Sequence, residues 1–150
     1  MSEISSGSPV IRPMLPSDME RIVEIDIKVL EKARPEYWEM KLELTQKHSQ
    51  VSALVAELDG KVAGFIIGGV SRWEYGVPEN IGWIDTIGID PEHQKKGLAK
   101  LLFSEMKNTL KKQGVVTVIT FVNRRDWRLL KFFNSLGFQP GDMTNLELDI

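Results

Sequence analysis

Six consecutive residues, Gln94-Lys95-Lys96-Gly97-Leu98-Ala99, have the types and the spacing needed to bind an anion. They follow a strand-like run, residues 81–89, and they open a helix that carries an apolar stripe. Where a strand turns into a helix, the free backbone N–H groups and the helix dipole attract negative charge. Gly97 has no Cβ and lets a bulky anion approach the backbone, while Lys95 and Lys96 add positive charge. The pattern predicts a pyrophosphate-binding loop.

The composition limits the kind of protein to which such a loop can belong. The chain has 150 residues, of which 42% are hydrophobic and 27% are charged, as in an ordinary globular domain. A net charge of −2 gives no support to nucleic-acid binding, and no apolar run is long enough to predict a membrane span. Because there is no cysteine, disulfides, thiolate metal sites and a cysteine nucleophile are excluded. The two histidines are too few for a histidine-rich centre, so we expect no metal.

The chain reads as one domain preceded by a short tail. Residues 1–9 are polar and contain serine and glycine, and we expect them to form a flexible N-terminal tail. They lack the apolar stretch of a signal peptide, which favours a cytoplasmic location. Residues 10–150 contain no repeat and no linker, and we expect them to form a single domain.

Apolar periodicity and turn residues predict strands and helices around the loop. Asp59-Gly60 predicts a two-residue hairpin turn, because a type I′ turn needs positive φ at both positions. The β-branched run 115–122 predicts a strand buried on both faces and, after a helical crossover, parallel to strand 81–89. The expected elements are strands 10–12, 51–58, 61–71, 81–89 and 115–122, a final strand or hairpin at 144–150, and helices opening at a Ser17–Glu20 capping box, at about Pro35, at Gly97 and at Asp126.

Three segments resemble the GNAT superfamily of N-acetyltransferases. Val10-Ile11-Arg12-Pro13 with the helix after it resembles the family's opening, and residues 87–102, with their Gln-x-x-Gly-x-Ala order, resemble its central motif. Phe132-Phe133-Asn134-Ser135-Leu136-Gly137-Phe138 resembles its closing motif. The resemblance covers about residues 10–150. It implies an α/β (α+β) fold of order β-α-α-β-β-β-α-β-α-β, with a mixed, mostly antiparallel central sheet flanked by helices.

This resemblance also implies acetyl-CoA as a co-substrate, with no metal. In the family, the fourth and fifth strands splay apart and the pantetheine arm lies in the gap. The backbone of Ile87, Gly88 and Ile89 would then bind that arm, and the Ile87 N–H would polarise the thioester carbonyl, where one fixed donor can matter greatly. Residues 94–99 would hold the pyrophosphate. Asp126, at a helix start where many members have Asn, would lie beside the cofactor.

Asp85 is the predicted catalytic base. A protonated amine must lose a proton before it attacks the thioester carbon, and many family members place a carboxylate here. Asp85 shares a predicted strand with Ile87 and, by period-two alternation, a face of that strand. Its short side chain favours a route through a water molecule. The alternative is a structural carboxylate, which would leave Glu79 or Glu74 of the preceding loop as the base.

The closing motif departs from the family pattern at Phe133. Many members have a tyrosine there that protonates the leaving thiolate, and a phenyl ring has no proton to give. Phe133 is therefore expected to pack beside the pantetheine arm or in the core. The acceptor side is expected to include Trp38, Trp73, Trp127 and Glu31, with Trp73-Glu74-Tyr75 as an aromatic and acidic cluster.

The resemblance predicts an N-acetyltransferase that moves an acetyl group from acetyl-CoA to a primary amine by direct attack. The acceptor is a peptide or protein N-terminus, or a small amine. The alternative is a non-catalytic acyl-CoA-binding regulatory domain, which Phe133 keeps open. A nucleotide-binding domain is disfavoured, since no Gly-x-x-x-x-Gly-Lys-Ser/Thr loop is present. The oligomeric state is open, a homodimer included.

Overall fold

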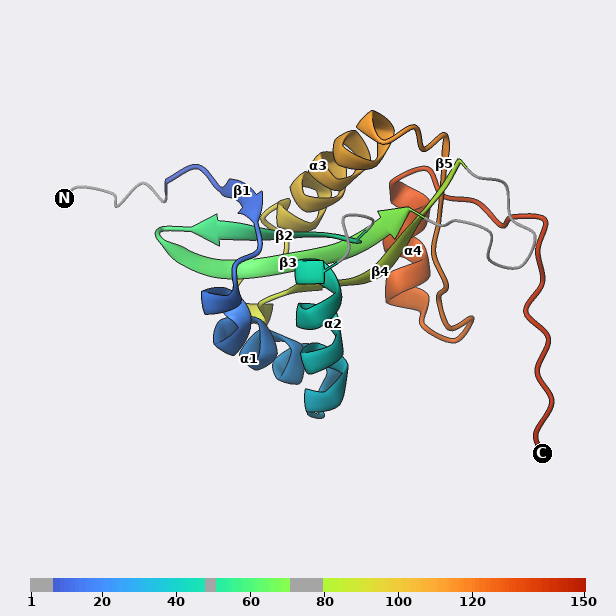
Figure 1. Cartoon of the computed structure of the whole chain (residues 1–150), viewed down its shortest axis with the longest axis horizontal. Coiled ribbons are helices and arrows are strands. Elements are labelled where there is room, and N and C mark those ends of the chain that lie inside the picture. Colours follow the sequence, from blue (N-terminus) through green and yellow to red (C-terminus); the bar gives the residue numbers. More distant parts are fainter. Residues whose placement is uncertain (1–6, 48–50, 71–79) are drawn as a thin grey trace. The chain divides into compact units, whose positions relative to one another are not determined.

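The computed structural model describes residues 7–47, 51–70 and 80–150 of the chain. Most of the predicted tail and the loop residues Trp73, Glu74, Tyr75 and Glu79 lie outside the described residues. The chain divides into two compact units, Met1–Thr120 and Phe121–Ile150. In chain order (Figure 1) the elements are β1 (Val10–Pro13), α1 (Met19–Leu30), α2 (Pro35–Lys47), β2 (Val51–Leu58), β3 (Lys61–Val70), β4 (Ile81–Ile89), α3 (Leu98–Lys112), β5 (Thr117–Ile119) and α4 (Trp127–Ser135).

A five-stranded sheet of order β1-β2-β3-β4-β5 forms the centre of the first unit. The pairs from β1 to β4 are antiparallel, whereas β4 and β5 are parallel. The parallel pair confirms the predicted crossover through α3. The β2–β3 hairpin turns at Asp59 and Gly60, whose φ values of 52° and 78° are those that a type I′ turn needs. The predicted α/β class, with a mixed and mostly antiparallel sheet, is confirmed.

Helices cover both faces of this sheet. A Cβ on Gly64 would lie 2.6 Å from the Ile89 side chain and 3.3 Å from Leu102 of α3. The next residue, Phe65, packs edge-on against Trp38 of α2, with ring centroids 5.1 Å apart. Because neighbouring residues of a strand point to opposite faces, α3 covers one face and α2 the other, as Figure 1 shows. The buried side chains include Ile22, Ile25, Trp38, Val55 and Phe65 on the α1–α2 face and Leu98, Leu102, Met106 and Leu110 from α3.

The second unit is organised around α4. The Asp126 carboxylate accepts a hydrogen bond from the Leu129 N–H at 3.1 Å, which confirms the predicted N-cap. Gly137, with φ 99°, ends the helix. Its N–H and that of Phe138 return to the carbonyls of Asn134 and Phe133, at 3.0 and 3.1 Å.

Two strand predictions were wrong in extent. The run 115–122 was expected to be buried on both faces, yet β5 spans three residues at the end of the sheet order, and Val116 is 77% exposed. A β-branched run favours an extended backbone, and it does not decide whether a second strand covers it. Residues 144–150 form no strand in the described structure, and Leu146, Leu148 and Ile150 are exposed. Their apolar alternation needs a neighbouring strand, and none is paired with them there.

The start of α1 also differs from the prediction. Ser17 lies inside a short 3₁₀ helix, Pro16–Asp18, and α1 begins at Met19. Asp18 accepts hydrogen bonds from the Leu15 N–H at 2.7 Å and from both terminal nitrogens of Arg12 at 2.8 Å. The hydrogen bonds from Arg12 lower the pKa of Asp18. In the part of the chain that is described, no helix has the length and hydropathy to cross a membrane.

Candidate active site

The sheet opens between β4 and β5, as the family resemblance implied. The ladder between these strands has three pairs and ends at Trp83 and Ile119. One more contact follows, from the Thr120 hydroxyl to the Ile84 carbonyl at 2.9 Å. Beyond it, β4 continues to Ile89 with β3 as its only ladder partner among the described strands. Ile87, Gly88 and Ile89 lie in this opened stretch, where backbone groups can meet an extended ligand.

Asp85 is the extra residue of a β-bulge. In the β3–β4 ladder Ile67 pairs with Thr86 and Gly68 pairs with Ile84, so Asp85 has no partner of its own. A bulge interrupts the alternation of side chains. Asp85 therefore reaches α2, where it contacts Tyr37, and not the α3 face where Ile89 meets Leu102. The prediction that Asp85 shares a face with Ile87 and Ile89 by simple alternation was wrong for this reason.

Two side chains of α2 meet the Asp85 carboxylate. The Lys41 ammonium forms an ion pair with Oδ2 of Asp85, and the Tyr37 hydroxyl donates to the same oxygen at 3.4 Å. The Asp85 side chain is 39% exposed, which leaves room for a third group from solvent. Burial raises the pKa of Tyr37, and the negative charge of Asp85 raises it further. The phenol is therefore a hydrogen-bond donor at neutral pH.

A buried carboxylate holds these α2 side chains in place. Asp26 of α1, 3% exposed, accepts bonds from Arg34 at 2.8 and 2.9 Å and from the Trp38 indole at 2.8 Å. These hydrogen bonds to Asp26 raise the pKa of Arg34. The guanidinium carbon of Arg34 lies 3.8 Å from the Tyr37 ring centre, and its Nη2 donates to the Thr86 hydroxyl at 3.3 Å. The network ties α1, α2 and the bulge of β4 together.

This α2 cluster was not predicted from the sequence. One sequence signal could have identified it: the i, i+3, i+7 spacing of Arg34, Tyr37 and Lys41, which places their side chains on one helix face. Trp38 was expected to line the acceptor side, but it is 2% exposed and belongs to the core. Glu31 follows α1 with φ 60° and is exposed.

The turn from β4 to α3 is anchored by Asp90. Its carboxylate is fully buried, pairs with Arg21, and accepts the Glu92 N–H at 3.0 Å. Burial alone would raise the pKa of Asp90, but the Glu92 hydrogen bond and Arg21 hold it below its usual range. Asp90, Glu92 and His93 also offer ligand atoms within 4.8 Å of one another. Arg21 already occupies the Asp90 carboxylate, so we assign no metal to this group.

The predicted anion loop has the required backbone geometry. Lys95 and Gly97 both have positive φ, 66° and 78°, and no atom of the described residues lies within 4 Å of a Cβ built on Gly97. The first bond of α3 runs from the Leu101 N–H to the Gly97 carbonyl at 3.1 Å. The N–H groups of Leu98 and Ala99 therefore have no acceptor within the helix.

Side chains of the loop have different roles. Lys95 and Lys96 are exposed, and the Lys96 ammonium lies 3.3 Å from Nδ1 of His93. The Gln94 side chain turns back to the Ile89 carbonyl at 3.3 Å, so it braces the loop against β4. Leu98 is 1% exposed and can offer a ligand its N–H group alone.

In the second unit the structure gives Asp126 and Phe133 local roles. The hydrogen bond from Leu129 accounts for Asp126 as an N-cap. The Phe133 ring packs edge-on with Phe132 and Phe138, with centroids 5.2 and 5.1 Å apart, and it is 5% exposed. Their contact with a cofactor stays a prediction.

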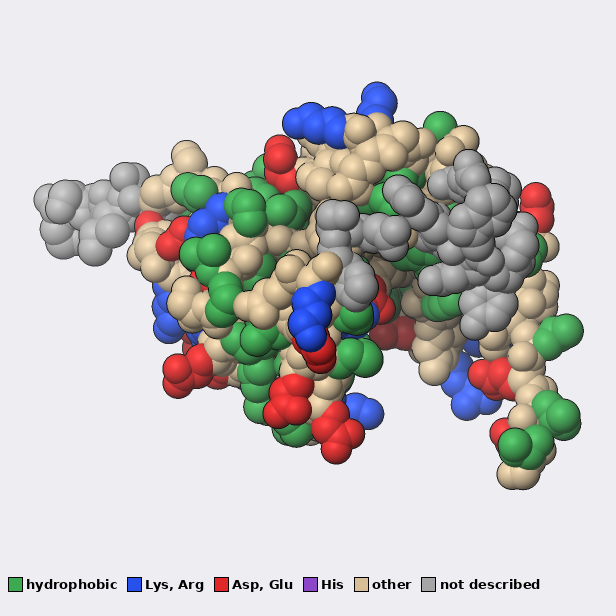
Figure 2. All heavy atoms as spheres, in the orientation of Figure 1, with side chains coloured by type: hydrophobic (Ala, Val, Ile, Leu, Met, Phe, Trp, Pro, Cys, Tyr) green, Lys and Arg blue, Asp and Glu red, His purple; other side chains and the backbone are tan. Residues whose placement is uncertain are grey.

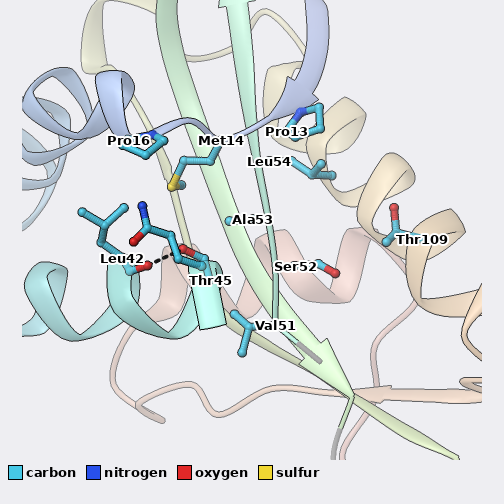
Figure 3. A pocket seen from close by; sticks show the side chains of 11 residues that line it. Pro13, Met14, Pro16, Leu42, Thr45, Val51, Ser52, Ala53, Leu54 and Thr109 are labelled. Carbon is cyan, nitrogen blue, oxygen red and sulfur yellow. Dashed lines mark hydrogen bonds between the residues drawn. The ribbon is translucent and has the colours of Figure 1, made fainter. Parts of the chain in front are cut away.

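A hollow of about 360 Å³ lies elsewhere on the first unit. Side chains from the end of β1, the second half of α2 and the start of β2 surround it, among them Met14, Leu42 and Val51 (Figure 3). The Thr45 hydroxyl at its wall donates to the Leu42 carbonyl at 2.9 Å. Neither Asp85 nor the anion loop lines it.

Comparison with known proteins agrees with this geometry. The profile of the Acetyltransferase (GNAT) family matches residues 19–138. The chain belongs to the GNAT acetyltransferase family. It is similar to a mycothiol acetyltransferase of Thermomonospora curvata, with 31% identity over 84 residues. The match covers 56% of this chain and 26% of the relative, so the chain spans about a quarter of that protein's length.

Solved structures share the fold at low sequence identity. AAC(6')-Iy, crystallised with the bisubstrate analogue CoA-S-monomethyl-acetylneamine, superposes with a TM-score of 0.82 at 14% identity, over 96% of this chain and 99% of that one. A possible acetyltransferase of Clostridium difficile 630 superposes with a TM-score of 0.76 at 20% identity, and the match covers 95% of this chain and 97% of that one. A transcriptional regulator of Bacillus halodurans C-125 superposes with a TM-score of 0.77 at 14% identity, and the match covers 95% of this chain and 100% of that one. These likenesses support the GNAT fold of the chain.

Proposed function

We propose that this chain is an acetyl-CoA-dependent N-acetyltransferase that acts on a primary amine. One observation carries the proposal: a single strand, β4, leaves the β4–β5 ladder, presents Asp85 at a bulge, and leads through the Asp90 turn into the Gly97 loop. A carboxylate, an open strand edge and an anion seat therefore follow one another along one short stretch of the chain, from β4 to the start of α3. Family membership supports the same reading.

The residues of the loop fit the pyrophosphate of CoA. Gly97 presents an open backbone with positive φ, and the first N–H groups of α3 lie beside it. Lys95 and Lys96 supply positive charge at the rim. Ile87, Gly88 and Ile89 would bind the pantetheine arm through their backbone. Bound acetyl-CoA would supply the activated acetyl group.

Asp85 would accept the proton that the acceptor amine must lose. Its carboxylate is half-exposed, while the Tyr37 hydroxyl and the Lys41 ammonium fix its position. The amine would then attack the thioester directly, with the Ile87 N–H as donor to the developing oxyanion. A cysteine acyl-enzyme is excluded because the chain has no cysteine.

The acceptor is a peptide or protein N-terminus or a small amine, and we favour the small cationic amine. Helix α2 exposes three acidic side chains, Glu36, Glu39 and Glu43. Figure 2 shows acidic side chains gathered over the lower part of the molecule, where α1 and α2 lie. The aminoglycoside acetyltransferases among the structural neighbours act on such amines. A cytoplasmic location belongs to the same proposal.

A non-catalytic acyl-CoA-binding regulatory domain is the second candidate. Phe133 favours it, because the ring belongs to an apolar cluster and cannot protonate a thiolate. A homodimer is part of our proposal for either function. The last residues of the chain expose Leu146, Leu148 and Ile150 in strand-like alternation, and a second copy would cover them.

The test is a panel of amines incubated with acetyl-CoA and followed by release of free thiol. We expect turnover with at least one small cationic amine and saturable binding of acetyl-CoA by calorimetry. Tight binding with no thiol release for any amine would favour the regulatory domain. Absence of binding would overturn both candidates.

A further inference from the structure

Lys41 occupies the position that an acceptor amine needs. Its ammonium is paired with the Asp85 carboxylate, the group that we propose as proton acceptor. An incoming substrate is also a primary ammonium and must approach the same oxygen atoms. The protein thus places one of its own primary amines where the substrate amine would lie.

The surroundings of Lys41 hold it at this position. Its side chain is 15% exposed, and its Nζ lies 5.3 Å from the Tyr37 ring centre. Lys47, two turns along α2, differs on each point: it is 66% exposed and pairs with Glu43 on its own helix. The two lysines share an element and a chemistry, and only Lys41 is paired with the proposed base.

We propose that Lys41 is a self-acetylation site, at which the chain acetylates its own α2 when no acceptor is bound. The inference rests on the proposed transferase function and adds a second activity to it. The flexible lysine stem allows Nζ to turn from Asp85 toward the open edge of β4, where Ile87 lies two residues further on.

The step balances with acetyl-CoA as the single co-reactant. The Lys41 ammonium gives a proton to Asp85, and the free Nζ forms a bond to the thioester carbonyl carbon. The C–S bond breaks, and CoA leaves as a thiolate. The nitrogen then loses its second proton to give the amide. One of the two protons ends on the thiolate sulfur and the other passes through Asp85 to solvent.

The experiment incubates the full chain with acetyl-CoA and no amine, and maps acetylated lysines by peptide mass spectrometry over time. We expect Lys41 to be acetylated ahead of Lys47, at a rate that does not change with protein concentration. Asp85→Asn is expected to slow acetylation of Lys41 by about 10²-fold or more, the range of general-base catalysis, and to leave Lys47 unchanged. Lys41→Arg keeps the charge and should remove this acetylation, while the matched Lys47→Arg should not.

Three results would overturn the inference: Lys41 modified no faster than Lys47, equal slowing of both lysines by Asp85→Asn, or a rate that rises with protein concentration. In each case thiol release with external amines can still stand, so the proposed function is judged separately. Loss of the proposed function itself would appear as absent thiol release with every amine of the panel, with or without acetyl-CoA binding in calorimetry. The wild-type lysine map is informative even where a variant fails to fold.

Discussion

The direction of the Asp85 side chain depends on one inserted residue. Without the bulge, β4 would pair residue by residue with β3, and the carboxylate would turn to the α3 face. With it, the carboxylate meets Tyr37 and Lys41 of α2. A residue-scale irregularity thus decides which helix surrounds the proposed base.

Asp85→Asn tests the base at nearly constant shape. The amide cannot accept the amine proton, so we expect kcat to fall by about 10²–10⁴-fold while affinity for acetyl-CoA stays unchanged. Thiol-release kinetics and calorimetry measure the two quantities. Glu105→Gln, at an exposed carboxylate on α3, is the matched control and should keep the parent rate. An unchanged kcat for Asp85→Asn would make Asp85 structural and bring Glu79 forward.

Phe133→Tyr tests whether the missing tyrosine matters. We expect the parent chain to turn over without that hydroxyl, and the variant to change the rate less than Asp85→Asn does. The new hydroxyl enters a cluster with Phe132 and Phe138, so a thermal melt must accompany the thiol-release assay. A silent parent that becomes active as Phe133→Tyr would refute the enzyme reading of the natural chain.

Single residues were predictable where their role is local. Asp126 as an N-cap and the positive φ of Asp59 and Gly60 follow from residue type and neighbours alone, and the structure confirms both. The partners of Asp85 were not predictable from the sequence. Tyr37 and Lys41 lie 48 and 44 positions away in the chain, and a β-bulge determines that the Asp85 side chain contacts them. The predicted contacts of Ile87 and of residues 94–99 with CoA stay predictions.

At the scale of elements, the start of α3 is the part most open to test. Gly97→Glu places bulk and negative charge beside the first N–H groups of the helix, and we expect acetyl-CoA binding to be lost in calorimetry. Gly114, at the other end of α3, is the matched control, since its φ is 90° and a Cβ there also meets no atom of the described residues within 4 Å. Gly114→Glu carries the same backbone strain and should bind as the parent does. Equal binding by both variants would remove the site from this loop.

The buried Asp90 in the turn between β4 and α3 should make the free energy of unfolding depend on pH in the acidic range. The folded-state pKa of Asp90 lies below its ordinary value of 3.8, so its contribution is complete above about pH 4 and is lost as the pH falls further. Asp90→Asn leaves Arg21 without its buried partner and should cost about 3–5 kcal/mol at pH 7. Denaturant unfolding at pH 7 and pH 3 checks both statements. A gap between parent and variant that is as wide at pH 3 as at pH 7 would contradict the assignment.

Elements were predictable to the extent that their own residues determine them. The β2–β3 hairpin follows from Asp59-Gly60, and the α3 crossover follows from its apolar stripe. The length of β5 does not follow from its own residues, because a strand ladder needs a neighbouring strand, and β4 separates from β5 after three residue pairs. The sequence signals of a strand, β-branching and alternation, are present at 115–122 and 144–150 alike, but pairing is a property of two segments.

At the scale of the whole molecule, the final residues have the pattern of a strand, and no strand of the described residues pairs with them. Leu146, Leu148 and Ile150 alternate with Glu147 and Asp149 and are exposed. Exposed apolar strands tend to associate edge to edge. The second unit also separates its charges, with Arg124, Arg125, Arg128 and Lys131 near α4 and Asp142, Glu147 and Asp149 near its end. Two copies that exchange these ends would bring opposite charges together, which supports a second copy as the partner.

The homodimer is tested by placing charge in that pattern. We expect the parent chain to sediment at twice the 17.0 kDa of one chain, and Leu146→Glu with Leu148→Glu to sediment as a monomer, because burying two carboxylates in an interface is costly. The matched control is Thr144→Glu with Asn145→Glu, which adds the same charge just before the alternating segment and should remain dimeric. Circular dichroism confirms that both variants fold. A parent that is monomeric at all concentrations, or a Leu146→Glu, Leu148→Glu variant that remains a dimer, would show that these residues do not join two copies.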